Sequence, residues 1–175
     1  LEKININHIS WENDMLVIEE KGIYSIEKFL LARRLMYWQV YLHKTVLSSE
    51  FMLIKLIQRA VYLVKYQQEI YLSPELDYFL KNEFTLEELK NDNGFLEKFS
   101  KMDDYEIFTC LKYWISSNDY VLSNLSKKIL NRDLLKIKIQ KNSFDTTKIK
   151  DCKELMITNE KITSHEVDFF IFSEK

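Results

Sequence analysis

The sequence predicts a mainly α-helical protein with an N-terminal β-hairpin and a small C-terminal α+β appendage. Three observations lead to this fold class. The chain has 175 residues but only 2 Gly and 1 Pro, and so few helix breakers favour long helices over a turn-rich sandwich or barrel. Apolar residues recur at helical spacing through most of the chain, whereas they alternate with polar residues near both ends. With 46% hydrophobic residues, the chain can bury one sizeable core.

The first predicted element is a hairpin of two short strands. Residues 9–11 and 15–18 are largely apolar or alternating segments, and the polar residues 12–14 between them suit a turn. Lys21-Gly22 is expected to end the hairpin, because glycine commonly interrupts regular structure.

A long helical segment follows the hairpin. Ser25 is a good N-cap, because its hydroxyl can accept a hydrogen bond from a free backbone N–H in the first turn. From there the apolar residues keep helical spacing to about Tyr66. A single helix of that length is unusual, so we expect a bend or break between Thr45 and Ser49.

Shorter helices farther along are predicted from their N-terminal signals. Ser73-Pro74 combines a capping residue with a first-turn proline, and Thr85 to Glu88 has the spacing of a capping box. Asp103-Asp104 and Asn118-Asp119 are expected to begin two further helices. Residues 91–94, Asn-Asp-Asn-Gly, form the clearest predicted turn.

A change of hydrophobic period near the C-terminus predicts the α+β appendage. Residues 135–139 alternate apolar and polar side chains as in a half-buried strand, and residues 167–172 are expected to form a second strand. Residues 147–157 between them have a helical pattern. We therefore divide the chain into a helical domain, residues 1–132, and the appendage, residues 133–175.

Composition and charge exclude several classes of protein. The 25 Lys and Arg residues are balanced by 27 Asp and Glu, and a net charge of -2 disfavours general nucleic-acid binding. Cys110 and Cys152 lie far apart and suit buried thiols in a reducing compartment, so we expect a cytoplasmic protein. No apolar run approaches the roughly 18 residues of a membrane span, and no signal-peptide pattern opens the chain, so we expect no membrane partner.

One face of the long helical segment carries two cations and two phenols. At about 100° per residue, Arg33, Tyr37, Tyr41 and Lys44 fall within roughly 80° of one another. A guanidinium can bind phosphate oxygens with two hydrogen bonds, and a tyrosine can stack on a base or donate to an oxygen. This equipment suits a nucleotide site. From periodicity alone, the alternative is that the tyrosine rings pack in the core while the charges reach solvent.

Five blocks of the sequence together resemble a known family. In order along the chain, they are Glu19 to Glu27, Ala32-Arg33, Met36 to Lys44, Met102 to Asp104, and Asn131 to Lys136. They resemble the segment downstream of the HD motif in bacterial HD-domain phosphohydrolases, which are related to dGTPases and to the mammalian SAM-and-HD-domain dNTPase. The resemblance covers roughly residues 9–140.

The resemblance implies both an activity and the residues that serve it. The chain would be the C-terminal part of a helical HD-type phosphohydrolase domain, and the intact protein would hydrolyse a deoxynucleoside triphosphate, dGTP or a similar one, to the deoxynucleoside and triphosphate. Arg33 would contact the triphosphate, while Tyr37 and Tyr41 would line the sugar and base side of the pocket. Relatives of this kind also form homo-oligomers. Four further positions are possible effector or phosphate contacts by the same resemblance: His43, Lys44, Arg132 and Lys136.

The metal chemistry of this family has no counterpart in the chain. The family holds a divalent metal ion with a His-Asp pair and further His and Asp ligands, and the metal polarises phosphate and activates water. Here no His-Asp pair exists, and His8, His43 and His165 are too scattered to identify a metal site. Asp103 and Asp104 have the pattern of a helix cap. We therefore expect the metal ligands to lie outside this chain, no catalytic residue within it, and no activity from the isolated chain.

A second hypothesis is a noncatalytic helical module for oligomerisation or interaction. Its basis is the missing metal motif together with an aromatic content of 14%. It predicts oligomers that have no affinity for nucleotides. Because the chain opens on Leu1 within an apparent strand, we expect further sequence upstream, and a His-Asp pair there would favour the enzyme.

Overall fold

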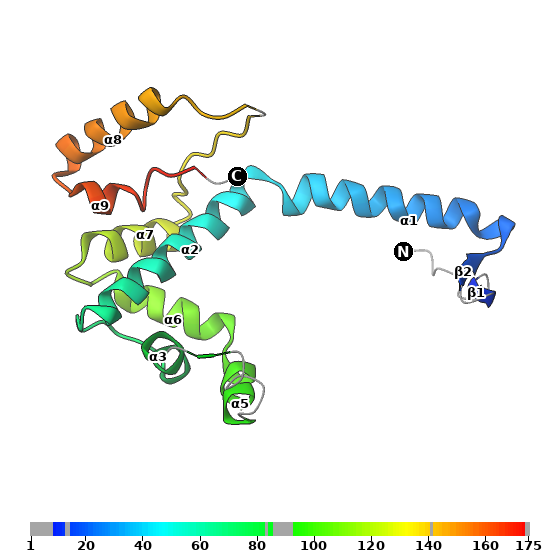
Figure 1. Ribbon diagram of the computed structural model, residues 1–175, viewed down its shortest axis with the longest axis horizontal. Coiled ribbons are helices and arrows are strands. Elements are labelled where there is room, and N and C mark those ends of the chain that lie inside the picture. Colours follow the sequence, from blue (N-terminus) through cyan, green and yellow to red (C-terminus); the bar gives the residue numbers. More distant parts are fainter. Residues whose placement is uncertain (1–8, 13–14, 83, 86–92, 141, 174–175) are drawn as a thin grey trace. The chain divides into compact units, whose positions relative to one another are not determined.

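The computed structural model describes residues 9–12, 15–82, 84–85, 93–140 and 142–173. Helices dominate these residues, which confirms the mainly α-helical class (Figure 1). The chain forms two compact units, Leu1–Leu47 and Ser48–Lys175, and each is described on its own.

The first unit opens with a short antiparallel pair of strands. β1 (Ile9–Glu12) pairs with β2 (Met15–Ile18), and Ile9 lies opposite Ile18. These strands occupy the positions of the predicted hairpin.

The helix that follows begins earlier than its capping signal predicts. A 3-10 turn, η2 (Glu20–Gly22), runs directly into α1 (Ile23–Met36), and the backbone N–H of Ile23 donates to the carbonyl of Glu20. Gly22 therefore takes the N-cap position and makes no side-chain capping bond. The predicted Ser25 cap is wrong, because the 3-10 turn already supplies the first helical hydrogen bond.

The long helical segment is interrupted, although no proline or glycine lies within it. α1 continues into a single π-helical segment, η3 (Tyr37–Tyr41), and regular structure ends at Leu42-His43 before α2 (Lys44–Lys65) begins (Figure 1). The break predicted between Thr45 and Ser49 thus lies a few residues earlier, and α2 begins close to where the break was expected to fall.

The second unit is built from α2 and shorter helices. α2 presents its buried side chains at helical spacing, with Met52, Leu56 and Leu63 among them. The other described helices of the unit are α3 (Pro74–Lys81), α5 (Asn93–Lys101), α6 (Asp104–Trp114), α7 (Tyr120–Leu130), α8 (Thr146–Glu160) and α9 (Ser164–Val167).

Three of the predicted helix caps are confirmed. The Ser73 side chain accepts a hydrogen bond from the N–H of Leu76, with Pro74 in the first turn. The Asp103 and Asp119 side chains accept in the same way at the starts of α6 and α7. Local signals of this kind succeed because the capping bond spans only a few residues.

Two predictions between α3 and α5 have a different outcome. The capping box expected at Thr85 to Glu88 lies outside the described residues from residue 86 onward. The predicted turn at residues 91–94 is described only from Asn93, and there Asn93 and Gly94 already belong to α5. Asn93 and Gly94 therefore begin a helix, whereas the prediction made them the end of a turn.

The predicted α+β character of residues 133–175 is wrong for the part that the structure describes. α8 confirms the expected helix, but residues 135–139 form no strand, and the described residues from 167 onward end α9 and continue through turns. The backbone of Leu135 bonds to side chains of α2, because the Ser48 hydroxyl donates to its carbonyl and its N–H donates to the sulfur of Met52. These side chains of α2 take the place of the backbone groups that a neighbouring strand would offer to Leu135.

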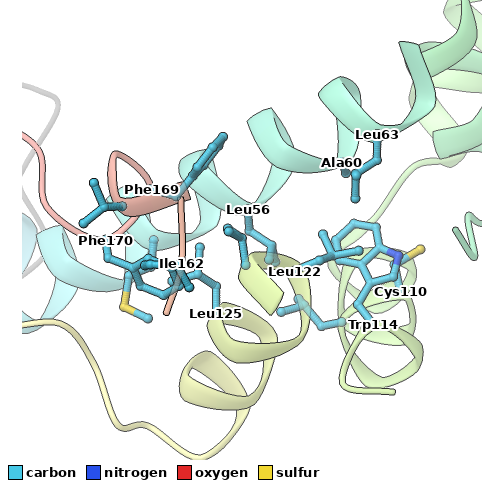
Figure 2. Close-up of a cluster of buried hydrophobic side chains, with 14 of the residues drawn as sticks. Leu56, Ala60, Leu63, Cys110, Trp114, Leu122, Leu125, Ile162, Phe169 and Phe170 are labelled. Atoms are coloured by element: carbon cyan, nitrogen blue, oxygen red, sulfur yellow. The ribbon is translucent and has the colours of Figure 1, made fainter. Parts of the chain in front are cut away.

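The core of the second unit joins segments that are distant in the sequence. Figure 2 shows side chains of α2, α6 and α7 packed together with residues that follow α8. Residues on both sides of the predicted boundary at residue 132 thus share one core. The labelled members are Leu56, Ala60, Leu63, Cys110, Trp114, Leu122, Leu125, Ile162, Phe169 and Phe170.

Candidate functional site

Arg33, Tyr37 and Tyr41 lie next to one another at the end of α1, as their spacing predicts. The ring centroids of Tyr37 and Tyr41 are 5.2 Å apart, with an angle of 59° between the ring planes. The guanidinium carbon of Arg33 lies 5.9 Å from the centroid of the Tyr37 ring, within cation–π range. All three side chains are exposed. The face therefore presents one guanidinium, a group whose chemistry allows it to bind phosphate, beside two aromatic rings that carry hydroxyl groups.

The two tyrosines stand at the ends of the π-helical segment η3. The N–H of Leu42 donates to the carbonyl of Tyr37 at 2.8 Å, one residue farther back than in an α-helix. This inserts one extra residue into the turn, and such insertions in helices frequently mark functional sites. Nothing in the residue types of this segment indicates the insertion.

The break after η3 separates His43 and Lys44 from the tyrosines' face. The single helical face predicted to extend to Lys44 is interrupted at Leu42-His43, so this part of the expectation is wrong. His43 has a local role, because its Nδ1 accepts a hydrogen bond from the N–H of Thr45 at 3.3 Å in the first turn of α2. Lys44 is the first residue of α2 and is exposed.

Arg132 and Lys136 belong to the second unit. Arg132 follows the end of α7 with a φ of 57°, in the left-handed region that ordinarily favours glycine. Its side chain is exposed, as is that of Lys136. A bulky residue held in this conformation costs backbone energy, which is a common mark of functional positions.

Lys136 also lines a groove that the sequence did not reveal. The groove has a volume of about 940 Å³ and is bounded entirely by residues of the second unit. Lys138 and Lys148 line it as well. The residues that form the groove come from four separate stretches of the chain, so no local motif could have identified it.

A second feature that the sequence did not predict is a pair of neighbouring carboxyl groups. Glu106 in the first turn of α6 interacts with Glu75 in the first turn of α3. Burial, followed by the hydrogen bond and the charge of Glu75, raises the pKa of Glu106 to about 7. Oε2 of Glu106 is buried and has no hydrogen-bond partner among the described residues.

The described residues do not fit the divalent metal that the family resemblance implies. Among them, no group of three or more His, Cys, Asp or Glu side chains is placed to hold a metal ion. We therefore derive no chemical step through a metal from these residues. None of the described helices combines the length and apolar character that crossing a membrane requires.

Comparison with known proteins connects the first unit and α2 with HD-domain proteins. Residues 3–72 match the family described as the HD associated region. This stretch contains Arg33, Tyr37 and Tyr41 together with η3.

Two individual proteins extend the similarity over most of the chain. The uncharacterized protein YwfO of Bacillus subtilis (strain 168) is 30% identical over 121 residues, which are 69% of this chain and 26% of YwfO. The crystal structure of a phosphohydrolase from Bacteroides thetaiotaomicron VPI-5482 is 42% identical, with a TM-score of 0.87. That match covers 94% of this chain and 41% of the phosphohydrolase. The chain therefore spans less than half the length of either protein.

Proposed function

We propose that this chain, which is related to the HD superfamily and has the structure of part of a phosphohydrolase, contributes the nucleotide-binding side of a metal-dependent enzyme. The proposed reaction hydrolyses a deoxynucleoside triphosphate, dGTP or a similar one, to the deoxynucleoside and triphosphate. The observation that carries the proposal is the Arg33, Tyr37 and Tyr41 face, which lies within the HD associated region.

Each of the three residues has a task that its chemistry suits. Arg33 would neutralise the charge of the triphosphate, because a guanidinium can hold two phosphate oxygens at once. Tyr37 and Tyr41 would position the nucleoside, since their rings can stack while their hydroxyl groups donate to sugar oxygens. Together they would hold the α-phosphate in place for attack by water. His43, Lys44, Arg132 and Lys136 remain proposed contacts for an effector or for phosphate.

Metal binding and the activation of water would be carried out by residues outside this chain. A divalent metal ion would be bound by ligands that this chain does not contain, and it would supply the activation of water. The isolated chain would then be inactive. We further propose that the protein acts in the cytoplasm as a homo-oligomer.

The test uses the full-length natural protein with Arg33→Ala and, as a matched control, Arg34→Ala. Release of triphosphate and deoxyguanosine from dGTP is measured with Mg²⁺ or Mn²⁺ present. Arg33→Ala should lower kcat/KM by roughly 100-fold, the size expected for losing one charge-stabilising donor. Arg34→Ala should stay near the wild type, because Arg34 lines a different hollow beside Ile18 and Ile23.

Three results would contradict the proposal. The first is the absence of dNTP hydrolysis by the full-length protein, and the second is an equal effect of the two arginine substitutions. The third is metal-dependent turnover by the isolated 175-residue chain, which the proposal says lacks the metal ligands.

A noncatalytic interaction module remains the second candidate, and α1 is the observation that favours it. α1 buries none of its side chains, and Phe29, Leu31 and Leu35 are among the large apolar residues that it exposes. A helix with apolar residues on all sides normally lies within a larger core or interface. Stabilisation of the protein by dNTPs that disappears in Arg33→Ala would count against this candidate, whereas oligomers without dNTP affinity would support it.

A further inference from the structure

The groove in the second unit combines an apolar interior with a basic rim. Its volume of about 940 Å³ falls within the range of small-molecule sites. Residues of α2, the extended segment after α7, the start of α8 and the chain after α9 bound it. None of the three residues of the proposed nucleotide face contributes to it.

One wall of the groove is fixed to the core by two contacts. The Ser48 hydroxyl donates to the carbonyl of Leu135 at 2.6 Å, and the N–H of Leu135 approaches the sulfur of Met52 at 3.2 Å. Met52 is only 1% exposed, so this anchor belongs to the hydrophobic core. The segment is thereby held in place as one wall of the groove.

Aromatic side chains form the apolar interior. The rings of Phe51 and Phe172 lie 6.1 Å apart at an angle of 58°, and Phe170 lines the groove from a nearly buried position. Ile149 of α8 adds an aliphatic surface. This interior suits the apolar body of a ligand, because covering apolar surface from water lowers the free energy of the complex.

The charges around the groove favour an anion. Lys136, Lys138 and Lys148 line it, and none of the three forms an ion pair with any residue that the structure describes. Asp145 is the one acidic side chain among the described residues of the lining, and its Oδ1 accepts the N–H of Thr147 at 2.9 Å as the cap of α8. The lining therefore carries three cations and one carboxylate, and the carboxylate already accepts a capping hydrogen bond.

We propose that this groove binds a small amphipathic anion, with an aliphatic or aromatic body against the phenylalanines and a carboxylate or phosphate head beside the lysines. The inference does not depend on the proposed nucleotide hydrolysis, because it shares only Lys136 with the residues proposed there and needs no turnover. The ligand is a free small molecule. Its negatively charged head group would form ion pairs with the lysines, which have no such pair with the described residues.

Cys152 provides a probe of this site. It lines the groove and is exposed, whereas Cys110 is completely buried, so an alkylating reagent reaches the former selectively in this chain. The rate of alkylation by iodoacetamide is measured in the full-length protein by mass spectrometry of the peptide that contains Cys152. Decanoate serves as the amphipathic anion, and decan-1-ol serves as its uncharged counterpart.

Decanoate should slow alkylation of Cys152 by at least about fivefold at saturation, because a bound ligand covers the thiol. The double variant Lys138→Gln/Lys148→Gln should need about tenfold more decanoate for half protection, since a charge-assisted contact is lost. Lys150→Gln is the matched control on the same helix, because Lys150 is exposed but does not line the groove, and it should behave as the wild type. Decan-1-ol should protect only at about tenfold higher concentration than decanoate.

Several results would overturn the assignment. One is an alkylation rate that decanoate does not change, and another is equal protection by decan-1-ol. An unchanged half-protecting concentration in the double variant, with its thermal unfolding intact, would also refute the role of the lysines. Protection by phosphatidylglycerol vesicles without protection by free decanoate would refute a free small molecule as the ligand.

Discussion

The guanidinium of Arg59 holds both carboxylate oxygens of Asp119 inside the second unit. Nε lies 3.2 Å from each oxygen, and Nη2 lies 2.6 Å from Oδ2. Arg59 is only 6% exposed, and Asp119 at the same time caps α7 through the N–H of Leu122 at 2.8 Å. A second carboxylate, that of Glu166 in the capping box of α9, lies 3.6 Å from Nη2. One side chain of α2 thus binds the N-terminal ends of two other helices.

Replacing Arg59 by methionine should lower the free energy of unfolding by about 3–5 kcal/mol, because it leaves the Asp119 carboxylate largely buried without its cation. Urea denaturation at neutral pH measures the change. Lys101→Met is the control, since it removes an exposed pair with Glu97 and should leave the free energy of unfolding nearly unchanged. Equal losses in the two variants would show that the buried pair is not a principal support of the unit.

Glu106 should make the second unit less stable as the pH rises from about 4.5 to 7. Its pKa is raised from 4.5 to about 7 in the folded protein, so the folded state binds the proton more tightly than the unfolded state. Below this window both states are protonated and the group has no effect. Within it the unfolded state ionises first, so stability falls, and above it the loss is constant.

Glu106→Gln removes this dependence and should gain stability relative to the wild type between pH 5 and pH 8. Urea denaturation at the two pH values gives the comparison. Glu97 is the control, because its hydrogen bond with Lys101 lowers its pKa. Glu97→Gln should therefore show no such gain, and a Glu106→Gln advantage that is the same at both pH values would disprove the raised pKa.

Arg132→Gly should increase the free energy of unfolding by about 1 kcal/mol, because glycine adopts a positive φ without the clash of a Cβ atom. Lys161→Gly is the matched control, since Lys161 ends α8 with a φ of 54°. Chemical denaturation should show similar gains in both. If Arg132 contacts nucleotides as proposed, Arg132→Gly alone should also alter the response of activity to added dNTPs. A lower free energy of unfolding in Arg132→Gly would contradict the claim that Arg132 strains the backbone.

Met52→Ala should destabilise the second unit by about 2–5 kcal/mol, because it removes a buried side chain and leaves a cavity in the core. It also removes the sulfur that the N–H of Leu135 approaches. Leu155→Ala tests an exposed leucine of α8 and should change stability by no more than about 0.5 kcal/mol. Thermal unfolding followed by circular dichroism separates the two, and a small loss in Met52→Ala would mean that this part of the core is loosely packed.

Several features that depend on neighbours in the sequence were predictable, although the Ser25 cap was not among them. Ser73, Asp103 and Asp119 cap the expected helices, because each capping bond joins residues three positions apart. The proximity of Arg33, Tyr37 and Tyr41 followed from helical spacing in the same way. Their role in binding a substrate stays a prediction.

Features that depend on distant contacts were not predictable. Leu135 and Ile137 are partly buried while Lys136 and Lys138 are exposed, as in a strand, but the expected alternation ends at Ile139, which is exposed. Any extended backbone alternates in this way, and only a partner decides whether it becomes a strand. Here the partner is a pair of side chains of α2, and Ser48 is 87 positions from the residue that it binds. The π-helical insertion at Tyr37–Tyr41 likewise has no signature in residue types.

The double attachment of Arg59 has a consequence for the newly made chain on the ribosome. α2 is synthesised well before several of its partners, which include Glu166, Phe169 and Phe172. At bacterial and eukaryotic translation speeds the delay is on the order of 10 s. During that time the apolar side of α2 is not fully covered, so we expect the nascent chain to bind chaperones. A message truncated shortly before the codon for Ile162 should yield a protein that aggregates or is degraded.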